Sequence, residues 1–346
     1  MNTIDLVDRF PRVPLVSGVT PIEEAPRLGA ALGLSLLIKR DDLTGLAFGG
    51  NKVRIVEFYF GAARAARADT ILITGSVQSN YARVAAAAAA KLGLTCHIQL
   101  EERMPDADSS YRESGNVLLD ELLGAVTFGY PVGEDEAGAD RALADRAGRL
   151  RSEGRTPYVI PLGPENPPLG ALGYVLAAQE IAGALEGVDA IVVGSGSGLT
   201  HAGLLFGLRA MDIHVPVIGI CVRRVADLQK ARIAKHCAKL ADMLAVPPVV
   251  GPDDVRVSDI SLGLGYGRLE ERIYEAVTLA ARTEGLIVDP TYTGKVLAGL
   301  KLLAEAGEIK RGARVMFIHT GGTPGLFGYV GPLRQRLHAR DTKAGD

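Results

Sequence analysis

Two glycines followed by an asparagine and a lysine, Gly49-Gly50-Asn51-Lys52, form the segment of this sequence best suited to covalent chemistry. The pattern after it predicts a helix from Val53, which places Lys52 where the positive end of the helix dipole disfavours a protonated amine. An unprotonated amine is a nucleophile that can form a Schiff base with a carbonyl compound. For this segment alone, a solvated lysine at a helix start is the alternative, because most lysines lie on the surface.

A glycine-rich segment from Val192 to Gly203 predicts a place for phosphate. It follows a predicted strand and opens a predicted helix, so free backbone N–H groups and the positive end of the helix dipole converge on it. A dinucleotide is disfavoured because the third glycine comes one residue early and because Asp212 precedes the next strand, which ends in Arg223-Arg224. The segment therefore favours a single phosphate monoester, with an ordinary glycine-rich turn as the alternative.

Three further segments could present polar side chains to a ligand. Ser79 and Asn80, between a strand and a helix, can offer a hydroxyl and an amide to a carboxylate at the helix N-terminus. In the other two, glycines beside a tyrosine or threonine leave room for a planar ligand. Taken singly, each is as readily a helix cap or a turn. The segments are Gly75–Tyr81, Gly265–Gly267, and Asp289–Lys295 together with His319–Gly322.

Short β-rich runs alternate with alanine-rich amphipathic runs through most of the chain. Strand, helix and strand in repeated succession indicate parallel sheets with crossover connections, so an α/β fold is expected. Ligands in such folds bind at the carboxyl ends of the strands. The predicted strands are Leu36–Lys39, Thr70–Thr74, Cys96–Leu100, Tyr158–Pro161, Ala190–Val193, Val217–Val222 and Val315–His319. The predicted helices are Val53–Ala68, Asn80–Leu92, Ser114–Leu123, Ala139–Gly154, Gly170–Gly183, Thr200–Met211, Leu228–Leu244, Glu270–Glu284 and Gly294–Ala306.

Together, seven ordered motifs resemble those of pyridoxal-phosphate (PLP) enzymes of the tryptophan-synthase-β-like fold, and among them the family of D-cysteine desulfhydrase and 1-aminocyclopropane-1-carboxylate (ACC) deaminase. The resemblance runs from residue 9 to residue 329. It implies two domains, each an open, mostly parallel twisted sheet flanked by helices, with PLP between them. The smaller domain, 51–164, would be inserted into the larger PLP-binding domain, 1–50 plus 165–346, and the chain would form a homodimer. The motifs are KRDDLTG, GGNK, QSN, GSGS with THAG, GYG, YTGK and HTGG.

The resemblance also implies roles for individual residues. Lys52 would hold PLP covalently, and Asn80 would face the 3′-oxygen of its ring. Ser79 would contact the substrate carboxylate. Tyr266 and Tyr292 would flank the reacting carbons. The phosphate would be bound by the loop residues Gly194, Ser195, Gly196, Ser197, Gly198, Leu199 and Thr200.

Thr293 and Thr320, implied to bind the cofactor, distinguish two activities of this family. In the deaminases that open the cyclopropane ring, glutamate usually stands at the place of Thr293 and keeps the pyridine nitrogen protonated, and leucine stands at the place of Thr320. A threonine hydroxyl can only hydrogen-bond a neutral pyridine, which makes the ring a weaker electron sink. Both threonines therefore favour elimination of a good β-leaving group over ring opening.

Three residues depart from the family pattern. Tyr81 replaces the usual histidine after QSN, Ile55 stands where a lysine often follows Lys52, and Leu199 replaces a small residue in the phosphate loop. Without that lysine, backbone amides and Thr200 would do more of the phosphate binding. These changes leave the PLP expectation standing and leave the substrate open.

The implied reaction is an α,β-elimination. Lys52 would remove the α-proton while Ser79 holds the carboxylate. Tyr266 or Tyr292 would protonate the departing group, and pyruvate and ammonia would be released. D-cysteine, with sulfide as third product, is the best match; ACC, L-cysteate and other β-substituted amino acids are alternatives. Two other classes stay open: a nucleotide-dependent oxidoreductase using Gly194–Gly198, and a PLP-binding protein without catalysis.

The amino-acid composition limits the classes of molecule that this protein can bind. Among 346 residues, 38 Lys or Arg against 40 Asp or Glu give a net charge of −2, too weak a field to hold nucleic acid or an anionic membrane. The longest uncharged stretch, Ala190 to Leu208, holds five glycines and is predicted to be a strand, a loop and a helix start. The acidic N-terminus shows no export signal, and Cys96, Cys221 and Cys237 have no metal-like spacing. We therefore expect a cytoplasmic protein without a metal site.

Overall fold

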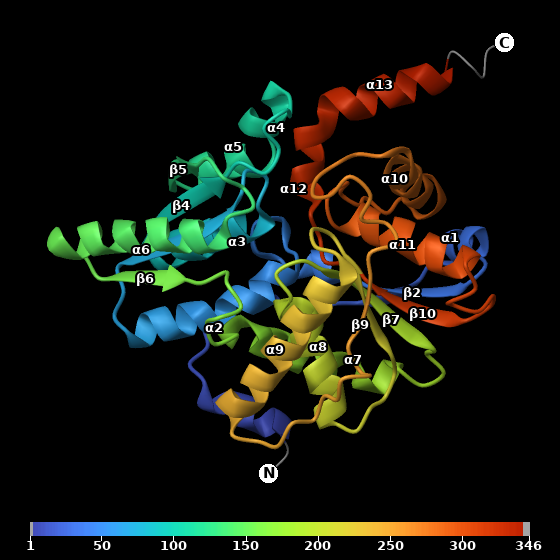
Figure 1. The fold of residues 1–346 in the computed structure, drawn as a ribbon, viewed down its shortest axis with the longest axis horizontal. Coiled ribbons are helices and arrows are strands. Elements are labelled where there is room, and N and C mark those ends of the chain that lie inside the picture. Colours follow the sequence, from blue (N-terminus) through green and yellow to red (C-terminus); the bar gives the residue numbers. More distant parts are fainter. Residues whose placement is uncertain (1–2, 342–346) are drawn as a thin grey trace.

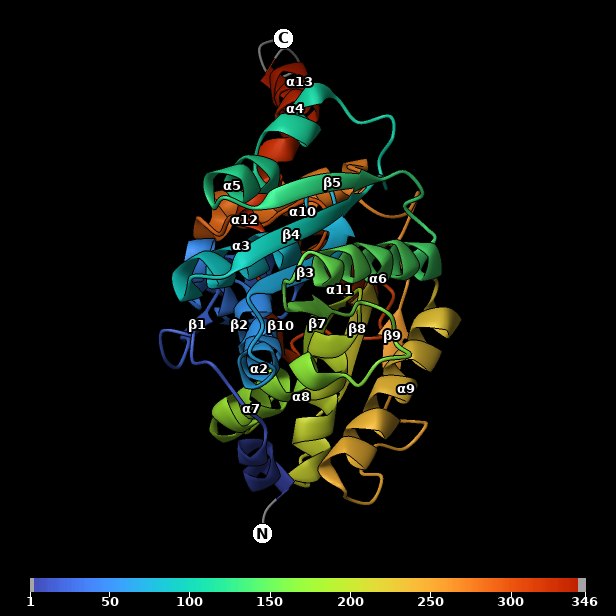
Figure 2. The same cartoon turned by 90° about the vertical axis from the view of Figure 1, so that its left-hand side faces the viewer.

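The computed structural model describes residues 3–341 and contains two β-sheets with helices on both faces (Figures 1 and 2). The larger sheet has the strand order β1-β2-β10-β7-β8-β9, and the smaller one β5-β4-β3-β6. The strands are β1 Ile22–Glu24, β2 Ser35–Lys39, β3 Thr70–Ser76, β4 Thr95–Glu101, β5 Val126–Tyr130, β6 Pro157–Ile160, β7 Ala190–Ser195, β8 Val217–Cys221, β9 Arg256–Ser258 and β10 Arg314–Ile318.

Helices connect successive strands and cover the sheets. The α-helices are α1 Pro26–Leu32, α2 Asn51–Ala65, α3 Asn80–Leu92, α4 Ser109–Glu113, α5 Asn116–Leu122, α6 Glu136–Ser152, α7 Leu172–Ile181, α8 Leu199–Ala210, α9 Ala226–Leu244, α10 Glu271–Glu284, α11 Thr293–Glu305, α12 Thr323–Leu326 and α13 Val330–Asp341. Short 3₁₀ turns are η1 Thr3–Arg9, η2 Asp41–Leu43, η3 Leu46–Phe48, η4 Leu169–Ala171, η5 Ala182–Ala184 and η6 Phe327–Tyr329.

Both sheets are parallel apart from β1, which pairs antiparallel with β2 at the edge of the larger sheet. Figure 2 shows the six strands of the larger sheet side by side, with the smaller sheet packed above them. The predicted α/β class, with mostly parallel sheets flanked by helices, is confirmed. A parallel sheet needs helical crossovers, and the alternating sequence pattern supplies them.

The hydrophobic core is divided by the larger sheet. On one face α1, α10 and α11 share one hydrophobic cluster with buried residues of β2, β7, β8 and β10; α1 contacts β2, and α11 contacts β7 and β8. On the other face α2, α7, α8 and α9 pack together, and this core continues to α3 on the smaller sheet. Helix α6 covers the opposite face of the smaller sheet, where Leu143 and Ala147 contact Leu72. Helix α2 therefore lies between the two sheets and contributes to the packing of both (Figure 1).

The helix α3 begins and ends where the sequence predicts. The hydroxyl of Ser79 accepts a hydrogen bond from the Ala82 amide at 3.1 Å and caps the start of the helix. Gly93 ends it in the left-handed conformation, with φ of +71°. The alanines Ala85–Ala89 between them are buried, so small side chains allow close packing against neighbouring elements.

Several short or peripheral elements differ from the predictions. The strands β1 and β9 were not predicted because each has three residues, too few for an alternating pattern. The strand β5 was also missed, since its side chains are mostly exposed and it lies at the sheet edge. The helix α1 was also not predicted, although the sequence marks both of its ends. Pro26 is at its first position, and Gly33 ends it with φ of +71°.

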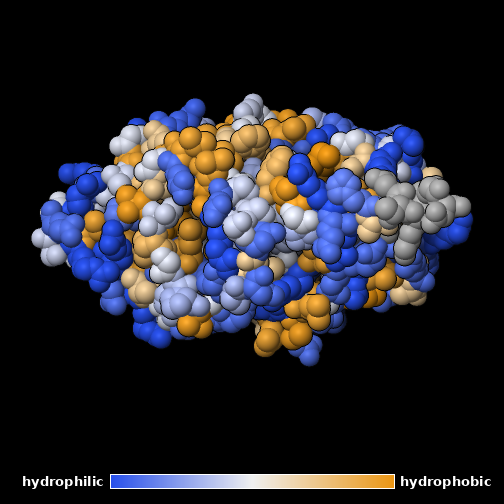
Figure 3. All heavy atoms as spheres, turned by 90° about the horizontal axis from the view of Figure 1, so that it is seen from above, coloured by the Kyte–Doolittle hydropathy of each residue, from blue (hydrophilic) through white to orange (hydrophobic). Residues whose placement is uncertain are grey.

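The chain passes from the larger sheet to the smaller one and back. It leaves after β2, enters the smaller sheet through α2, and returns at β7. The division into 1–50 plus 165–346 and 51–164 stays a prediction, and its ends at 1–2 and 342–346 lie outside the described residues. No helix within residues 3–341 has the length and apolar composition to cross a membrane. On the face drawn in Figure 3, hydrophobic residues lie in patches separated by hydrophilic ones.

Close packing of α8 on the segment before α7 gives a testable constraint. A Cβ at Gly203 would lie 2.2 Å from the carbonyl oxygen of Ala171, whereas a Cβ at Gly183 would meet nothing within 4 Å. We expect Gly203→Ala to lower the free energy of unfolding by about 1–3 kcal/mol, the usual cost of overpacking. Gly183→Ala should change it little. Urea unfolding of both variants measures the difference, and equal stability would contradict the contact.

Candidate active site

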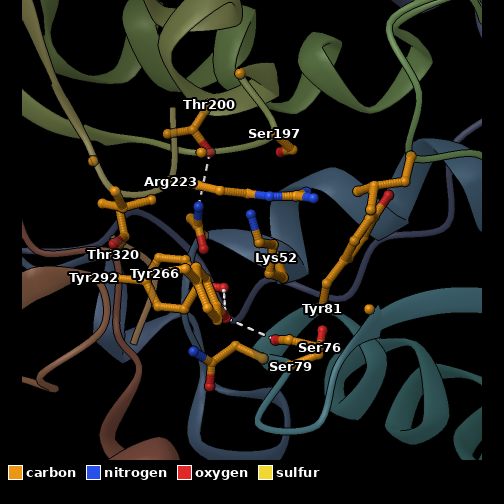
Figure 4. A pocket seen from close by; sticks show the side chains of 18 of the residues that line it. Lys52, Ser76, Ser79, Tyr81, Ser197, Thr200, Arg223, Tyr266, Tyr292 and Thr320 are labelled. Carbon is orange, nitrogen blue, oxygen red and sulfur yellow. Dashed lines mark hydrogen bonds between the residues drawn. The ribbon is translucent and has the colours of Figure 1, made fainter. Parts of the chain in front are cut away.

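A solvent-open cavity, with about 880 Å³ of empty space when its open part is included, lies where loops from both sheets meet the start of α2 (Figure 4). Four of these loops follow the carboxyl ends of β3, β7, β8 and β10. The structure thus brings together segments that lie up to 270 residues apart in the chain. The predicted site residues that line the cavity are Lys52, Ser79, Asn80, Gly194, Gly196, Ser197, Gly198, Thr200, Tyr266, Tyr292 and Thr320. Ser195, Leu199 and Thr293 do not line it.

Lys52 is in the first turn of α2, and its side chain points into the cavity (Figure 4). Its ammonium nitrogen lies 5.5 Å from the centre of the Tyr81 ring. Within residues 3–341 no carboxylate pairs with this amine. Burial lowers the pKa of Lys52 to about 8, because the protein around it solvates the ammonium form poorly. Roughly a tenth of the amine is therefore unprotonated at pH 7, far more than of an ordinary lysine, and this fraction can act as a nucleophile.

The start of α2 is positioned by close backbone contacts. Gly50, with φ of +106°, approaches Gly321 so closely that a Cβ at Gly321 would lie 2.8 Å from the Cα of Gly50. The amide of Asn51 donates to the carbonyl of Thr320 at 3.0 Å, and its side-chain Nδ2 donates to the hydroxyl of Thr200 at 2.8 Å. The residue before Lys52 thus links α2 to the loop after β10 and to the start of α8.

A buried group of ions lies beneath the same helix. Arg54 on α2 donates to both oxygens of Asp41, at 2.9 and 3.0 Å, and to both oxygens of Glu180, at 2.9 and 3.0 Å. The Tyr174 hydroxyl donates to Asp41 at 2.6 Å, and Lys39 pairs with Glu180. Although burial opposes it, the charge of Arg54 holds the pKa of Asp41 below its ordinary value. The KRDD motif thus anchors α2 from below the cavity.

The glycine-rich loop passes from β7 into α8 through Gly198, which has φ of +97° and caps the helix. The first backbone N–H groups of α8 have no partner within the helix, as at any helix start. Because Asn51 donates to the Thr200 hydroxyl, the proton of that hydroxyl is available to a ligand. Arg224 donates to the Gly196 carbonyl at 3.1 Å and Arg232 to the Ser197 carbonyl at 2.7 Å. The loop therefore combines free donors with nearby positive charge.

Two residues of this loop direct their side chains elsewhere. The Ser195 hydroxyl accepts from Gln229 at 2.8 Å and lies 3.2 Å from Nδ1 of His201. The Leu199 side chain is buried in the core beneath α8. Leu199 in place of a small residue therefore leaves the cavity unchanged. Sequence periodicity did not separate these two side chains from their neighbours, because loop residues have no regular face.

The side-chain oxygen of Asn80 already accepts hydrogen bonds from within the protein. Its Oδ1 accepts from Arg83 at 2.9 Å and from Asn116 at 3.2 Å, so the NH₂ group is the part left for a ligand. Arg83 is fully buried and also donates to the Gly49 carbonyl at 2.8 Å. Ser79 accepts from the Ala82 amide, and its own hydroxyl proton remains available. The start of α3 thus presents an amide, a hydroxyl and backbone N–H groups together.

Three hydroxyl groups form a chain in the cavity wall. Ser76 at the end of β3 lies 2.7 Å from the Tyr266 hydroxyl, which lies 2.7 Å from the Tyr292 hydroxyl (Figure 4). The two tyrosine rings meet edge to face, with centroids 5.9 Å apart. Burial raises the pKa of Tyr292 well above its ordinary value, so its phenol remains protonated. The chain can therefore donate a proton to a group in the cavity.

Of the two threonines predicted to bind the cofactor, Thr320 lines the cavity and Thr293 does not. The Thr293 hydroxyl donates to Oδ1 of Asp289 at 2.7 Å and accepts from the Asp289 amide at 2.9 Å. Asp289 also accepts from the amides of Thr291 and Tyr292, at 2.9 and 2.8 Å, so it organises the turn that delivers Tyr292. Thr320 lines the cavity. Thr293 as a partner of the pyridine stays a prediction, and in this structure its donor is used within the protein.

Four charged residues of the cavity wall were not predicted as site residues. Glu136 at the start of α6 accepts from Arg223 at 2.7 Å, from Arg224 and from Arg232 at 3.0 Å. These contacts join the smaller sheet unit to the larger one beside the glycine-rich loop. Only tertiary contact brings these charges together, although the Arg223-Arg224 pair after a strand was a visible signal. These four are Arg103, Glu136, Arg223 and Arg224, and the hydroxyl residues Thr74 and Ser76 also line the wall without having been predicted as site residues.

The remaining departure from the family pattern, Ile55, has a packing role. Its side chain is fully buried, and a Cβ at Gly170 would meet it at 2.5 Å. A lysine there would be placed in the core near the start of α7. The positive charge beside the phosphate loop comes from Arg224 and Arg232, which donate to loop carbonyls.

The donor set fits a flat, phosphorylated aldehyde. An amine without a partner, at Lys52, lies between the helix start at Thr200 and the free amide of Asn80. Figure 4 shows Thr200 and Ser197 on one side of Lys52 and Ser76 and Ser79 on the other. A phosphate bound beside Thr200 and Ser197 would leave the amine of Lys52 for an aldehyde. The donors beside Ser79 would then be left for an amino acid. The residues present therefore fit PLP.

Comparison with known proteins agrees with this geometry. Residues 13–321 match the family described as pyridoxal-phosphate dependent enzyme. The D-cysteine desulfhydrase of Yersinia enterocolitica is 40% identical over 324 residues, which cover 93% of this chain and 96% of that protein. The D-cysteine desulfhydrase of Salmonella schwarzengrund is also 40% identical over 324 residues, covering 93% and 97%.

Solved structures show the same fold. The structure described as an ACC deaminase homologue has a TM-score of 0.86 and 37% identity, covering 96% of this chain and 98% of that one. An O-ureido-L-serine synthase has a TM-score of 0.64 and 19% identity, covering 95% of each chain. At that identity the second likeness concerns the fold alone.

The role of the buried ion group in anchoring α2 can be tested by measuring the free energy of unfolding. Asp41→Ala leaves the buried Arg54 with half of its carboxylate partners and Tyr174 without an acceptor. We expect a loss of about 3–5 kcal/mol in the free energy of unfolding, as for other broken buried ion pairs. Glu305→Ala, which removes an exposed partner of Lys301, should have little effect. Urea unfolding measures both, and a stable Asp41→Ala variant would contradict the anchoring role.

Proposed function

This chain belongs to the family of pyridoxal-phosphate dependent enzymes, and on that premise we propose that it is a lyase that eliminates the β-substituent of a small amino acid. D-cysteine is the proposed substrate, with pyruvate, ammonia and sulfide as products. The observation that carries the proposal is the amine of Lys52, which lies without a carboxylate partner between two groups of hydrogen-bond donors. The choice of D-cysteine rests on the two desulfhydrases that are 40% identical over nearly the whole chain.

The cofactor would be held at three places. Lys52 bonds to it covalently, the loop from Gly194 to Thr200 binds the phosphate, and the Asn80 amide donates to the ring oxygen. Arg224 and Arg232 place positive charge beside that loop. Bound PLP supplies an electron-accepting ring that acidifies the α-carbon of the attached amino acid. Of Thr293 and Thr320, Thr320 is the one that lines the cavity, and its hydroxyl would be the partner for the pyridine nitrogen.

Lys52 is the proposed base. With the amino acid bound in the cavity, its Nζ would receive the proton from the α-carbon. Burial holds the pKa of this amine near 8, which suits proton transfer close to neutral pH. The Tyr81 ring lies beside this amine, 5.5 Å from it, and offers it an aromatic face.

The carboxylate of the substrate would bind at the start of α3. The Ser79 hydroxyl and the first backbone N–H groups of the helix are free to donate there, and the helix dipole favours the negative charge. This holds the Cα–H bond toward Lys52. On the other side of the reacting carbons, the hydroxyl chain of Ser76, Tyr266 and Tyr292 delivers a proton to the departing group.

The cavity favours elimination over ring opening. Among the described residues that line it, Glu136 is the one acid, and three arginines bind its carboxylate. No lining carboxylate is therefore available to keep a pyridine nitrogen protonated, and a neutral pyridine is a weaker electron sink. Cyclopropane cleavage needs the stronger sink. ACC deamination remains the second candidate because the 37% identical structure is described as an ACC deaminase homologue.

Two properties complete the proposal. We infer a cytoplasmic location, because the three cysteines Cys96, Cys221 and Cys237 are free and buried, which suits a reducing compartment. We also infer a homodimer, from the resemblance to the family. Size-exclusion chromatography with light scattering measures the second property directly.

A product-resolved assay tests the function. The PLP-loaded enzyme should form pyruvate, ammonia and sulfide in equal amounts from D-cysteine, and pyruvate, ammonia and chloride from 3-chloroalanine. ACC should give no 2-oxobutyrate, because the cavity lacks an acid for the ring nitrogen. Release of 2-oxobutyrate without sulfide would instead establish the second candidate. Absence of pyruvate from every β-substituted amino acid would overturn the proposal.

The pKa of Lys52 gives a pH dependence. Because burial lowers it to about 8, half of the amine is neutral near that pH, and the neutral fraction levels off roughly two pH units higher. The rate of covalent PLP attachment to the apoprotein should follow the same curve, whereas an ordinary lysine would be half neutral only at about pH 10.4. Stopped-flow absorbance measures the rate.

Borohydride reduction and peptide mapping identify the attachment site. The label should be on Lys52 and be absent from Lys52→Ala. Lys295 is the internal control: burial also lowers its pKa to about 8, but its ammonium donates to the carbonyls of Leu262 and Gly265. Label on Lys295, or turnover by Lys52→Ala, would contradict the assignment. The variant should lose at least about 10²-fold in kcat, as expected for a missing general base.

A further inference from the structure

Lys295 is a buried charged residue that the proposed mechanism does not use. It lies in the first turn of α11, three residues after Tyr292, and its side chain is fully buried. Its ammonium group donates to the carbonyl of Gly265 at 2.6 Å and to that of Leu262 at 3.0 Å. Gly265 is the residue directly before Tyr266. Lys295 thus ties the segment that carries Tyr292 to the loop that carries Tyr266.

Tyr329 makes a similar contact on the other side of Tyr266. Its hydroxyl donates to the carbonyl of Gly267 at 2.7 Å and lies 2.9 Å from the Thr291 hydroxyl. Because the single proton of Tyr329 is used on Gly267, Thr291 is the donor in the second contact. Gly267 directly follows Tyr266, and Thr291 directly precedes Tyr292. One buried hydroxyl therefore holds a chain neighbour of each tyrosine.

The two glycines beside Tyr266 suit these contacts. Gly265 and Gly267 have φ of +102° and +71°, a left-handed backbone that glycine adopts without strain. A Cβ at Gly267 would lie only 3.0 Å from the hydroxyl oxygen of Tyr329. The GYG motif is therefore matched to the donors on both sides of its tyrosine.

The loop that carries Tyr266 depends on contacts from outside itself. Residues 259–270 connect β9 to α10 and contain no helix or strand, and Leu264 in their middle is 79% exposed. Neither Lys295 nor Tyr329 is among the described residues that line the cavity. Their hydrogen bonds to the carbonyls on either side of Tyr266 are therefore positioned to fix the loop without touching a ligand.

We propose that Lys295 and Tyr329 form a clamp that positions the hydroxyl pair of Tyr266 and Tyr292 for proton delivery. The clamp keeps the two phenol oxygens at their separation of 2.7 Å by fixing the backbone beside each tyrosine. This inference rests on the proposed elimination and adds two positioning residues to it.

The proton step balances without an oxidant or reductant. The α-proton goes to Nζ of Lys52, and the electron pair of the broken Cα–H bond forms the Cα=Cβ double bond. The Cβ–S bond breaks with its electron pair on sulfur, and one phenol of the pair gives its proton to that sulfur. After hydrogen sulfide has left, the phenolate takes a proton back from water.

Two substrates that differ in their need for this proton test the clamp. The holoenzyme is assayed with D-cysteine and with D-3-chloroalanine, because chloride leaves as a weak base whereas sulfide is more basic and gains from protonation. Tyr329→Phe keeps the ring and removes only the hydroxyl. It should lower kcat/KM for D-cysteine about 3- to 10-fold relative to 3-chloroalanine, the range expected for a lost hydrogen bond. Lys295→Met should change the ratio in the same direction.

Tyr111→Phe is the matched control. The Tyr111 ring meets the Tyr329 ring edge to face at 5.7 Å, but its own hydroxyl is buried without a hydrogen-bond partner among residues 3–341. Its removal should leave the substrate ratio unchanged. A double variant tests the route of the effect. When Tyr266→Phe has already removed the hydroxyl pair, adding Tyr329→Phe should change the ratio no further.

Hydrogen exchange gives a readout that does not depend on turnover. Backbone amides of residues 261–269, followed by mass spectrometry of the peptides that contain them, should exchange about 3- to 10-fold faster in Tyr329→Phe and in Lys295→Met than in the unchanged protein. The same amides in Tyr111→Phe should exchange at the original rate.

The outcomes separate the clamp from the elimination. If pyruvate forms but Tyr329→Phe leaves the ratio unchanged, or lowers kcat/KM equally for both substrates, the positioning role is overturned and the elimination stands. An unchanged ratio in Tyr266→Phe also overturns it, because the hydroxyl pair is then not the proton donor. If no substrate gives pyruvate, the elimination itself fails. Equal exchange of residues 261–269 in Tyr329→Phe and the unchanged protein would overturn the clamp whatever the turnover.

Discussion

The placement of one amine governs the rest of this structure. Lys52 has to be buried enough for its pKa to fall to about 8, yet remain open to a cavity and, within residues 3–341, unpaired with any carboxylate. Burial of an ammonium group is unfavourable, so the helix that carries it must be held firmly. The ion group of Asp41, Arg54 and Glu180 below α2, and the contact of Gly50 with Gly321 above it, provide this support.

Around that amine, the donors are divided between two sheets. The start of α8 and the loop after β10 belong to the larger sheet, and the start of α3 belongs to the smaller one. Their carboxyl strand ends face the same cavity, and Asn51, Arg83 and Glu136 each connect elements across it. The proposed chemistry depends on this arrangement: phosphate on one side, the substrate carboxylate on the other, and the reacting carbons beside Tyr266 and Tyr292.

The sequence predicted the regular elements well where burial on one face imposes a period. Helix α3 was predicted at both ends because Ser79 and Gly93 mark them. Elements without such a period, such as the three-residue strands β1 and β9, could not be found. Among the predicted site residues, those in glycine-containing loops that follow a strand mostly line the cavity. Ser195, Leu199 and Thr293 show the limit, because spacing cannot tell which way a loop side chain points.

By itself, the sequence determined the α/β class, the PLP family, the amine at Lys52 and the glycine-rich loop at the start of a helix. These depend on local residue order, since a helix start creates free donors whatever surrounds it. Only the tertiary structure decided what the amine and the donors meet: the burial that lowers the pKa of Lys52, the Asp289 carboxylate that occupies Thr293, and the Arg103 guanidinium beside Tyr266. Burial, charge and the direction of a side chain depend on residues far away in the chain, and local spacing does not contain them.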